Sequence, residues 1–247
     1  MTYPIFQNKH LEEPLFTPKE YLGHYGSGEK FPKKAILTFQ DSSLRYFKKR
    51  FKGEHKLKKF AGAKAYILPK KGILFLKIQG IGSPHAVTVL EELIAYGVKE
   101  FIIVGTAGGL QKEGIFLCNG ALRDEGTSYH YHAHEKFSYP DKKLTGRLRK
   151  ILEKMKIKHE KGLTWTIDAK KKKKKKEIEH YRKEGIATVE MEASALFAIA
   201  KLKNVKIAAT FVVSDTLIKK WNPKFKHINT KKALNVLIDC AIECLRK

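Results

Sequence analysis

The sequence predicts a single α/β domain with helices on both faces of a largely parallel sheet. Short apolar runs typical of buried strands alternate with stretches of helical periodicity over almost the whole chain. The chain has 247 residues, of which 43 % are hydrophobic, and this is enough for one large core. Residues 1–33 contain proline, glycine and lysine without clear periodicity, so we expect an N-terminal arm followed by one domain at 34–247.

In the first half of the chain, strands and helices follow one another closely. The continuous apolar runs predict strands at 34–39, 63–68, 72–79 and 99–105. The turn sequence PKKG joins the second of these strands to the third. Helical periodicity predicts a helix at 42–51, with Ser42 as a candidate N-cap, and another at 85–97.

The second half continues the same alternation. Strands are expected within 115–126, 158–168 and 205–215. Helices are expected at 141–155, 190–200 and 230–247. The run of seven lysines from Lys170 to Lys176 is the one low-complexity segment, and we expect it to form an exposed loop or the start of a helix.

Composition restricts the class of protein. Fifty Lys and Arg against 25 Asp and Glu give a net charge of +25, but the lysines are spread over the chain without an RNA-binding motif, which indicates a lysine-rich surface rather than a nucleic-acid interface. No apolar run is long enough for a membrane span, and the N-terminus does not read as a signal peptide, so a cytoplasmic location is expected. The spacing of the three cysteines matches no metal site; two of them, Cys240 and Cys244, share a helix face as core residues.

Small or polar residues follow several of the predicted strands directly. They lie at 80–84, 105–110, 123–131 and 214–216. Because ligands of α/β proteins bind at the carboxyl ends of strands, these four segments are candidate parts of one site. The glycines of GIGSP and GTAGGL allow a backbone to approach an anion or a sugar, although a glycine after a strand is more often only a turn.

Three carboxylates lie where the predicted elements change. Glu190 and Glu192 flank Met191 at the expected start of an apolar helix, where an acidic residue usually is a solvated charge. Glu192 precedes a buried-looking stretch, so it is also a candidate acceptor for two sugar hydroxyls. Asp215 ends an apolar run, either as a helix cap or as an acid in a partly desolvated cleft.

Three motifs together resemble a known family. VGTAGGL (104–110), VEMEASALFAIA (189–200) and VVSD (212–215) are similar to segments of the nucleoside phosphorylases, which include uridine phosphorylases and hexameric purine nucleoside phosphorylases. RDEGTSYHY (123–131) resembles the uridine-phosphorylase-like members, and the likeness extends from about residue 34 to the C-terminus. The resemblance implies a three-layer sandwich with a mixed central sheet, in which 34–247 is the catalytic domain.

The resemblance also implies roles around the sugar. Glu192 would bind the ribose 2′- and 3′-hydroxyls, with Met191 under the sugar and Thr106 between ribose and phosphate. Gly80 and Gly82 would let the backbone approach the nucleophile.

Roles around the base follow in the same way. Asp215 would donate a proton or a hydrogen bond to the leaving base, and an Asp there is typical of the purine-cleaving members. Residues expected to contact the base are Gly108, Arg123, Asp168 and Glu190.

Departures from the family pattern concern the phosphate. The pattern has an N-terminal Gly-Asp-Pro followed by an Arg. This chain instead has Phe-Gln-Asp-Ser-Ser-Leu-Arg at 39–45, which ends in Arg45. Ile103 stands where the pattern has an Arg before Val-Gly, and Arg45, Arg123 or a lysine is the candidate replacement. A further departure concerns the base: in the base-contacting segment after Asp168, lysine replaces an aromatic residue expected around 170–171.

The resemblance therefore implies phosphorolysis of a purine or pyrimidine nucleoside, with inorganic phosphate as co-substrate and no cofactor or metal. Two alternatives stay open. One is a hydrolytic nucleosidase, for which Asp41 lies near the position of the water-activating carboxylate. The other is an inactive relative that acts as a binding protein. A homo-oligomer, either a dimer or a hexamer, is expected, with His10 or His24 of an arm reaching a neighbouring site.

Overall fold

The computed structural model describes most of the chain. The described residues are 3–26, 30–60, 63–218, 220–224 and 227–246. Parts of the expected arm, at 1–2 and 27–29, and Lys247 of the expected last helix lie outside these ranges. Within them, no helix is long and apolar enough to cross a membrane.

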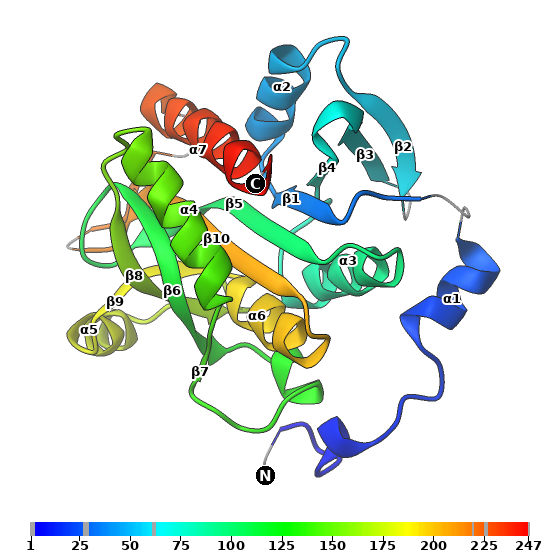
Figure 1. The fold of residues 1–247 in the computed structure, drawn as a ribbon. Coiled ribbons are helices and arrows are strands. Elements are labelled where there is room, and N and C mark those ends of the chain that lie inside the picture. Colours follow the sequence, from blue (N-terminus) through cyan, green and yellow to red (C-terminus); the bar gives the residue numbers. More distant parts are fainter. Residues whose placement is uncertain (1–2, 27–29, 61–62, 219, 225–226, 247) are drawn as a thin grey trace.

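An 11-stranded mixed sheet forms the centre of the molecule, as the resemblance implied (Figure 1). The longer strands are β1 (Lys34–Thr38), β2 (Lys56–Phe60), β3 (Ala63–Leu68), β4 (Ile73–Lys77), β5 (Glu100–Gly109), β6 (Ile115–Asp124), β8 (Glu160–Ile167), β9 (Ile186–Glu190) and β10 (Lys206–Thr216). Two short strands, β7 (Phe137–Ser138) and β11 (Asn222–Pro223), extend it. β1 lies between β4 and β5 and is parallel to both, whereas β3 and β2 continue the sheet in antiparallel fashion.

Part of the sheet closes on itself. β5 is parallel to β10, β10 is antiparallel to β6, and β6 is parallel to β8. β8 is parallel to β9, which returns antiparallel to the end of β5. The sandwich expected from the sequence is therefore partly a closed barrel, in which these strands have no free edge.

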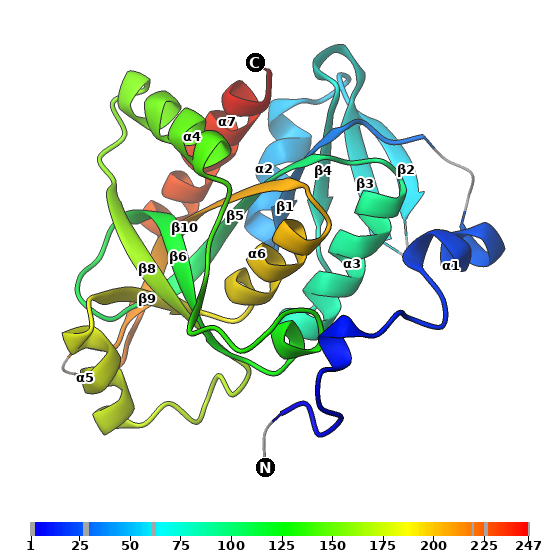
Figure 2. The same ribbon diagram turned by 60° about the horizontal axis from the view of Figure 1, so that its bottom comes forward.

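Helices cover both faces of the sheet, because successive side chains of a strand point to opposite sides. Leu37 and Ile103 pack against α3 (Ser83–Ala95) and α6 (Ala193–Leu202) in one apolar cluster. Ile36 and Ile102, their immediate neighbours in sequence, pack in a second cluster on the other face. Its helices are α2 (Asp41–Arg50), α4 (Lys142–Lys154) and α7 (Ile228–Arg246), and Figures 1 and 2 show the two groups on opposite sides.

The predicted elements are confirmed, but the structure differs from the prediction at several points. α2 begins at Asp41 after Gln40 as N-cap, so Ser42 lies inside the first turn and caps nothing. The helix expected from residue 190 begins at Ala193, because 186–190 form the short buried strand β9. The sequence analysis missed β2, whose KLKKF is too rich in lysine to read as a strand. It also missed α1 (Pro18–Tyr25) in the N-terminal segment.

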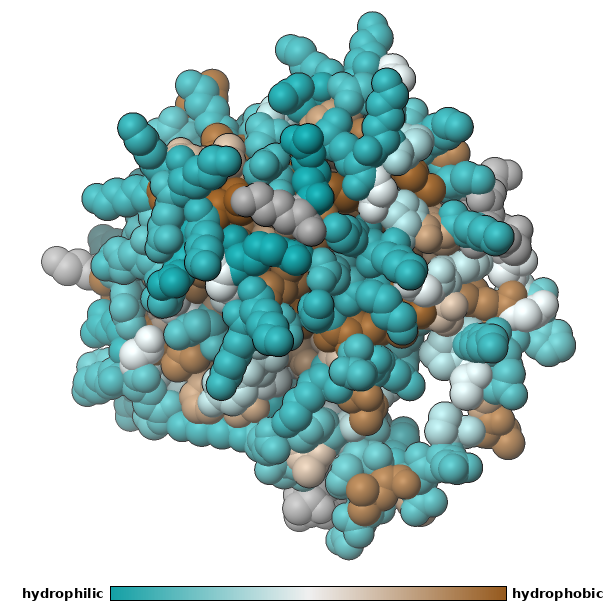
Figure 3. Space-filling model, viewed as in Figure 1, coloured by the Kyte–Doolittle hydropathy of each residue, from teal (hydrophilic) through white to brown (hydrophobic). Residues whose placement is uncertain are grey.

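The lysine run divides into two parts. α5 (Lys175–Lys183) begins inside the run, so the expectation of a helix start is confirmed. The preceding residues, 170–174, form a loop. Polar side chains cover most of the face shown in Figure 3, as expected for a lysine-rich surface.

The N-terminal segment crosses the outside of the domain and exposes apolar side chains. Phe6, Leu15 and Phe16 have exposed fractions of 66 %, 100 % and 62 %. Its helix α1 lies next to α3. Its short helical turn at Lys9–Leu11 lies near the short helix at 127–130 (Figure 2).

Phe47→Ala is expected to lower the free energy of unfolding by about 3–5 kcal/mol, because the cavity that it leaves lies in the core. The Phe47 ring is fully buried and stacks on Phe75 with ring centroids 4.1 Å apart. Urea denaturation measures the change. Phe16→Ala in the exposed segment removes the same atoms and is the matched control, expected to cost less than about 1 kcal/mol. Equal losses for the two variants would contradict this account of the core.

Candidate active site

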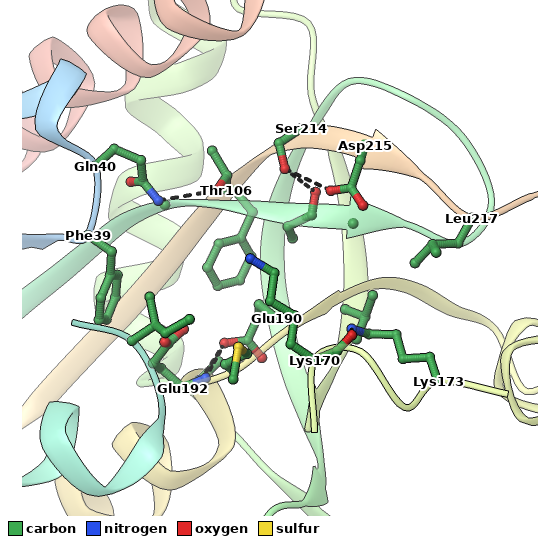
Figure 4. Close-up of a pocket in the computed structure, with 18 of the residues that line it drawn as sticks. Phe39, Gln40, Thr106, Lys170, Lys173, Glu190, Glu192, Ser214, Asp215 and Leu217 are labelled. Atoms are coloured by element: carbon green, nitrogen blue, oxygen red, sulfur yellow. Dashed lines mark hydrogen bonds between the residues drawn. The ribbon is translucent and has the colours of Figure 1, made fainter. Parts of the chain in front are cut away.

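A cavity of about 700 Å³ opens at the carboxyl ends of β5, β9 and β10 (Figure 4). Its walls include the turn between β9 and α6, and the loop at 170–173. Phe39 and Gln40, which directly follow β1, line another side. Strand ends separated by more than 100 residues in the sequence therefore meet around one space.

Six residues predicted for the site line this cavity. They are Thr106, Gly108, Glu190, Met191, Glu192 and Asp215. Glu192 and Asp215, whose separation would have ruled out a shared site, lie on different walls of the same space (Figure 4).

The Glu192 carboxylate is held by the loop that precedes α3. The Gly82 N–H donates to Glu192 Oε1 at 2.6 Å, and Ser83 Oγ donates to the Met191 carbonyl at 2.9 Å. Gly82 has a φ of 104°, a conformation that side chains rarely adopt. Burial raises the pKa of Glu192, while the Gly82 N–H and the charge of Lys170 oppose that rise.

The predicted role of Gly80 and Gly82 at a nucleophile needs correction. Neither residue lines the cavity, although Ile81 between them does. The Gly82 N–H is already engaged by Glu192, so this loop positions the carboxylate.

Glu190 is buried and accepts three hydrogen bonds from the protein. Thr166 Oγ1 donates to its Oε1 at 2.6 Å, and the N–H groups of Glu192 and Ala193 donate to its Oε2 at 2.7 and 2.6 Å. Burial, with the neighbouring charge of Glu192, raises the pKa of Glu190 to about 8. These three bonds tie Glu190 to β8 and to the start of α6, so it positions the turn at 190–193. Glu190 also lines the cavity, and its contact with a base stays a prediction.

Asp215 lies at an irregularity in β10, where the pairing with β5 shifts between Val213 and Asp215. Ser214 Oγ donates to Asp215 Oδ1 at 2.9 Å, and Trp221 Nε1 donates to Oδ2 at 3.0 Å. Gly108 lies beneath the carboxylate, and a Cβ there would come within 3.1 Å of both Leu217 and Val189. The glycine therefore lets the Asp215 wall approach β5 closely.

Thr106 lies on β5 next to the end of β1. Gln40 Nε2 donates to Thr106 Oγ1 at 3.1 Å, and Thr38 Oγ1 donates to Gln40 Oε1 at 3.0 Å. This short chain of hydrogen bonds provides neutral polar groups, and no cation, on that side of the cavity. The apolar Ile103 lines the cavity nearby.

Two further predicted site residues, Arg45 and Asp168, lie outside the cavity. Arg45 is exposed on α2, beside Tyr46 and Lys49, and does not line the cavity, so it cannot bind phosphate there within one subunit. The Asp168 carboxylate accepts from the Gly126 N–H at 2.8 Å and also lies outside the lining.

Arg123 has a structural role. Its buried guanidinium donates to Ser128 Oγ at 2.9 Å and to the Ala133 carbonyl at 2.7 Å, and lies 4.4 Å from the centre of the Tyr129 ring. The expected base contact is therefore wrong for Arg123, because the loop at 127–135 already uses its donors.

Asp41, the candidate water-activating carboxylate, also lies outside the cavity. It pairs with Lys77 at 3.1 Å, and 69 % of its side chain is exposed. Gln40 lines the cavity in its place.

The cavity contains lysines that the sequence indicated only as an unspecified replacement for the missing arginines. Lys170, Lys171 and Lys173 line it, and Lys170 and Lys171 are at the same time exposed, as expected of the run. Lys173 Nζ donates to the Lys170 carbonyl at 2.7 Å, and burial lowers the pKa of Lys173. The signal was present in the lysines that replace an expected aromatic residue directly after the end of β8.

Comparison with known proteins places the chain in a family. The model of the phosphorylase superfamily matches residues 35–246. The chain belongs to this superfamily. A purine nucleoside phosphorylase of Plasmodium vivax is 30 % identical to this chain over 186 residues. The match covers 71 % of this chain and 76 % of the relative.

Other relatives match over different lengths. A guanosine phosphorylase of Halorubrum lacusprofundi is 29 % identical over 56 % of this chain, and the match spans 59 % of that relative's length. The crystal structure of an AMP nucleosidase from Bacteroides thetaiotaomicron has a TM-score of 0.75 and 21 % identity, with coverage of 94 % of this chain and 99 % of that one. At this identity the structural likeness establishes the fold.

Glu190→Gln is expected to abolish one pH dependence of stability in this superfamily member. The pKa of Glu190, about 8 in the folded chain against a reference value of 4.5, means that folding takes up a proton between these values. The contribution of this group to stability is therefore complete below about pH 4.5 and is lost as the pH rises towards 8. The free energy of unfolding of the wild type, relative to the variant, should fall over that range in urea denaturation.

A matched control is Glu179→Gln on the exposed side of α5, where Glu179 pairs with Lys183. This variant should keep the pH slope of the wild type. A difference between wild type and Glu190→Gln that is constant from about pH 5 to 8 would show that Glu190 is ionised throughout.

Proposed function

We propose that this protein is a nucleoside phosphorylase that cleaves the N-glycosidic bond with inorganic phosphate. The products are a free base and ribose 1-phosphate or its deoxy form, which makes the enzyme a pentosyltransferase. The observation that carries the proposal is the placement of Glu192 and Asp215 on different walls of one cavity.

The chemistry of the reaction fits these two walls. Breaking the C–N bond leaves positive charge on the sugar and negative charge on the base. A carboxylate at Glu192 accepts hydrogen bonds from the sugar hydroxyls and stabilises the positive charge beside them. Asp215 donates a proton or a hydrogen bond to the departing base, and Ser214 and Trp221 orient its two oxygens.

A purine is the proposed base. An acidic residue at 215 resembles the purine-cleaving members, in which N7 takes the proton. The Plasmodium vivax relative, matched over most of both chains, is named a purine nucleoside phosphorylase. A pyrimidine nucleoside is the competing substrate to be included in the assay.

A hydrolytic nucleosidase is the second candidate. No arginine lines the cavity among the residues that the structure describes, and phosphate is commonly bound by arginine. Against hydrolysis, Asp41 lies outside the cavity and pairs with Lys77. Without a carboxylate at that position, water lacks the base that would activate it.

The remaining expectations belong to the same proposal. The enzyme needs no cofactor beyond phosphate and assembles as a homo-oligomer, a dimer or a hexamer. Its three cysteines are free and buried in the described structure, which suits the cytoplasm as its location.

The deciding experiment measures consumption of inosine, guanosine, adenosine and uridine with and without phosphate, and follows ribose 1-phosphate. We expect cleavage of a purine nucleoside that requires phosphate and yields one ribose 1-phosphate per base. Free ribose formed at a rate independent of phosphate would establish the nucleosidase instead. No cleavage of any nucleoside would favour a binding protein.

Substitutions at the two walls should affect different steps. Glu192→Gln weakens the bonds to the sugar hydroxyls, and we expect kcat/KM to fall about 10- to 100-fold. Asp215→Asn removes the proton for the base, and we expect kcat to fall about 100-fold or more. Steady-state kinetics on the best purine nucleoside measures both, with Glu179→Gln as the variant that keeps wild-type activity.

A further inference from the structure

The cavity needs a positive charge if a phosphate dianion is to enter it. Glu190, Glu192 and Asp215 contribute three carboxyl groups to the lining. Gln40, Thr106 and Ile103, on the side where the family pattern places arginines, contribute no cation. Among the described residues, the basic side chains of the lining are all lysines of the loop at 170–173.

Lys170 has the most suitable position of these lysines. Figure 4 shows its side chain extending from the loop across the cavity towards the strands β5 and β10. Its charge acts on Glu192, the proposed ribose-binding residue. Since the nucleophile must attack the anomeric carbon of the same ribose, a cation near Glu192 is also near the attacking anion.

Lys173 fixes this arrangement. Its ammonium is half-buried, donates to the Lys170 carbonyl at 2.7 Å, and lies within electrostatic reach of the Asp215 carboxyl group. The loop therefore places the two positive charges in different surroundings. The Lys173 ammonium lies against the backbone of its own loop and near Asp215, whereas the Lys170 side chain extends across the cavity.

We propose that Lys170 binds a phosphate dianion beside Glu192 and thereby replaces the arginines of the family pattern. The proposal rests on the proposed function, since it assigns the phosphate site of that reaction. A lysine ammonium binds phosphate as a point charge with three donors, without the planar geometry of an arginine. The phosphate group is either free inorganic phosphate or the 5′-phosphate of a nucleotide substrate; the position next to Glu192 favours the free ion.

Three variants test this assignment. Lys170→Met removes the charge, Lys170→Arg keeps it, and Lys172→Met removes a charge from an exposed lysine of the same run that does not line the cavity. Binding of inorganic phosphate is measured by calorimetry and by tryptophan fluorescence, since Trp221, one of the two tryptophans, lines the cavity. Thermal melting confirms that each variant is folded.

We expect Lys170→Met to weaken phosphate binding about tenfold or more, the loss typical of one charge-assisted hydrogen bond. In the steady state, the KM for phosphate should rise more than the KM for the nucleoside. Lys170→Arg should restore most of the affinity, and Lys172→Met should stay within about twofold of wild type. A purely structural role of Lys170 would change all substrates alike and would not be rescued by arginine.

The pH profile gives an independent readout. The Lys170 charge opposes the rise in the pKa of Glu192 that burial causes, whereas Asp168 and Glu190 are the acidic groups near it. Lys170→Met should therefore move the acid limb of kcat/KM to higher pH, because Glu192 must be ionised to accept the sugar hydroxyls. Lys172→Met should leave that limb in place.

Failure of this assignment can be distinguished from failure of the proposed function. If the wild type cleaves nucleosides without phosphate, phosphorolysis is wrong, and nucleoside 5′-monophosphates become the probe. Preference of the wild type for the monophosphate over the nucleoside, lost in Lys170→Met, would then support Lys170 as a ligand of the 5′-phosphate. Equal affinities of Lys170→Met and Lys172→Met for both probes, or no binding of either probe by the wild type, would overturn the assignment.

Discussion

The active site depends on the burial of two carboxyl groups, Glu190 and Glu192, at the end of β9. An ionised carboxylate in such a place is costly unless protein donors surround it. The donors come from Thr166 on β8, from the turn into α6, and from Gly82 before α3. The same hydrogen bonds that make the burial tolerable therefore hold three separate segments in one arrangement.

This constraint explains why Glu190 and Glu192, which have the same side chain, have different roles. Glu190 is surrounded by donors on both oxygens and carries a raised pKa, so it acts as part of the scaffold. Glu192 receives a bond from Gly82 at one oxygen and lies at the wall of the cavity, where a substrate hydroxyl can reach it. Position along the turn, and not residue type, separates the supporting role of Glu190 from the sugar binding proposed for Glu192.

The opposite wall of the cavity, which carries Asp215, depends on a shift in strand register. The register of β10 against β5 shifts between Val213 and Asp215, and this brings the acid to the cavity above a glycine of β5. The barrel closure between β5 and β10 sets the distance between the two walls, because β9 also pairs with β5. One long strand thus serves as the common reference for the residues proposed to bind the sugar and the base.

The sequence by itself determined the alternation of strands and helices and the chemistry of the two walls. Apolar runs followed by Gly105 and Asp215, and the pattern of 189–200, are local features that can be read directly. Local patterns could not reveal β9 or β2, which are short or lysine-rich and are stabilised by strand pairing. They also could not give the closure of the barrel, which joins strands distant in sequence.

Only the tertiary structure decided where each side chain lies and which groups it contacts. Arg123 and Arg45 have the right chemistry for an anion, yet one is used by its own loop and the other points away on α2. The lysine run was expected to be exposed, and Lys170 is exposed, but it also lines the cavity because the loop that follows β8 lies there. Charge and hydrogen-bonding capacity are properties of a residue, whereas the partner that uses them is fixed by how distant segments pack.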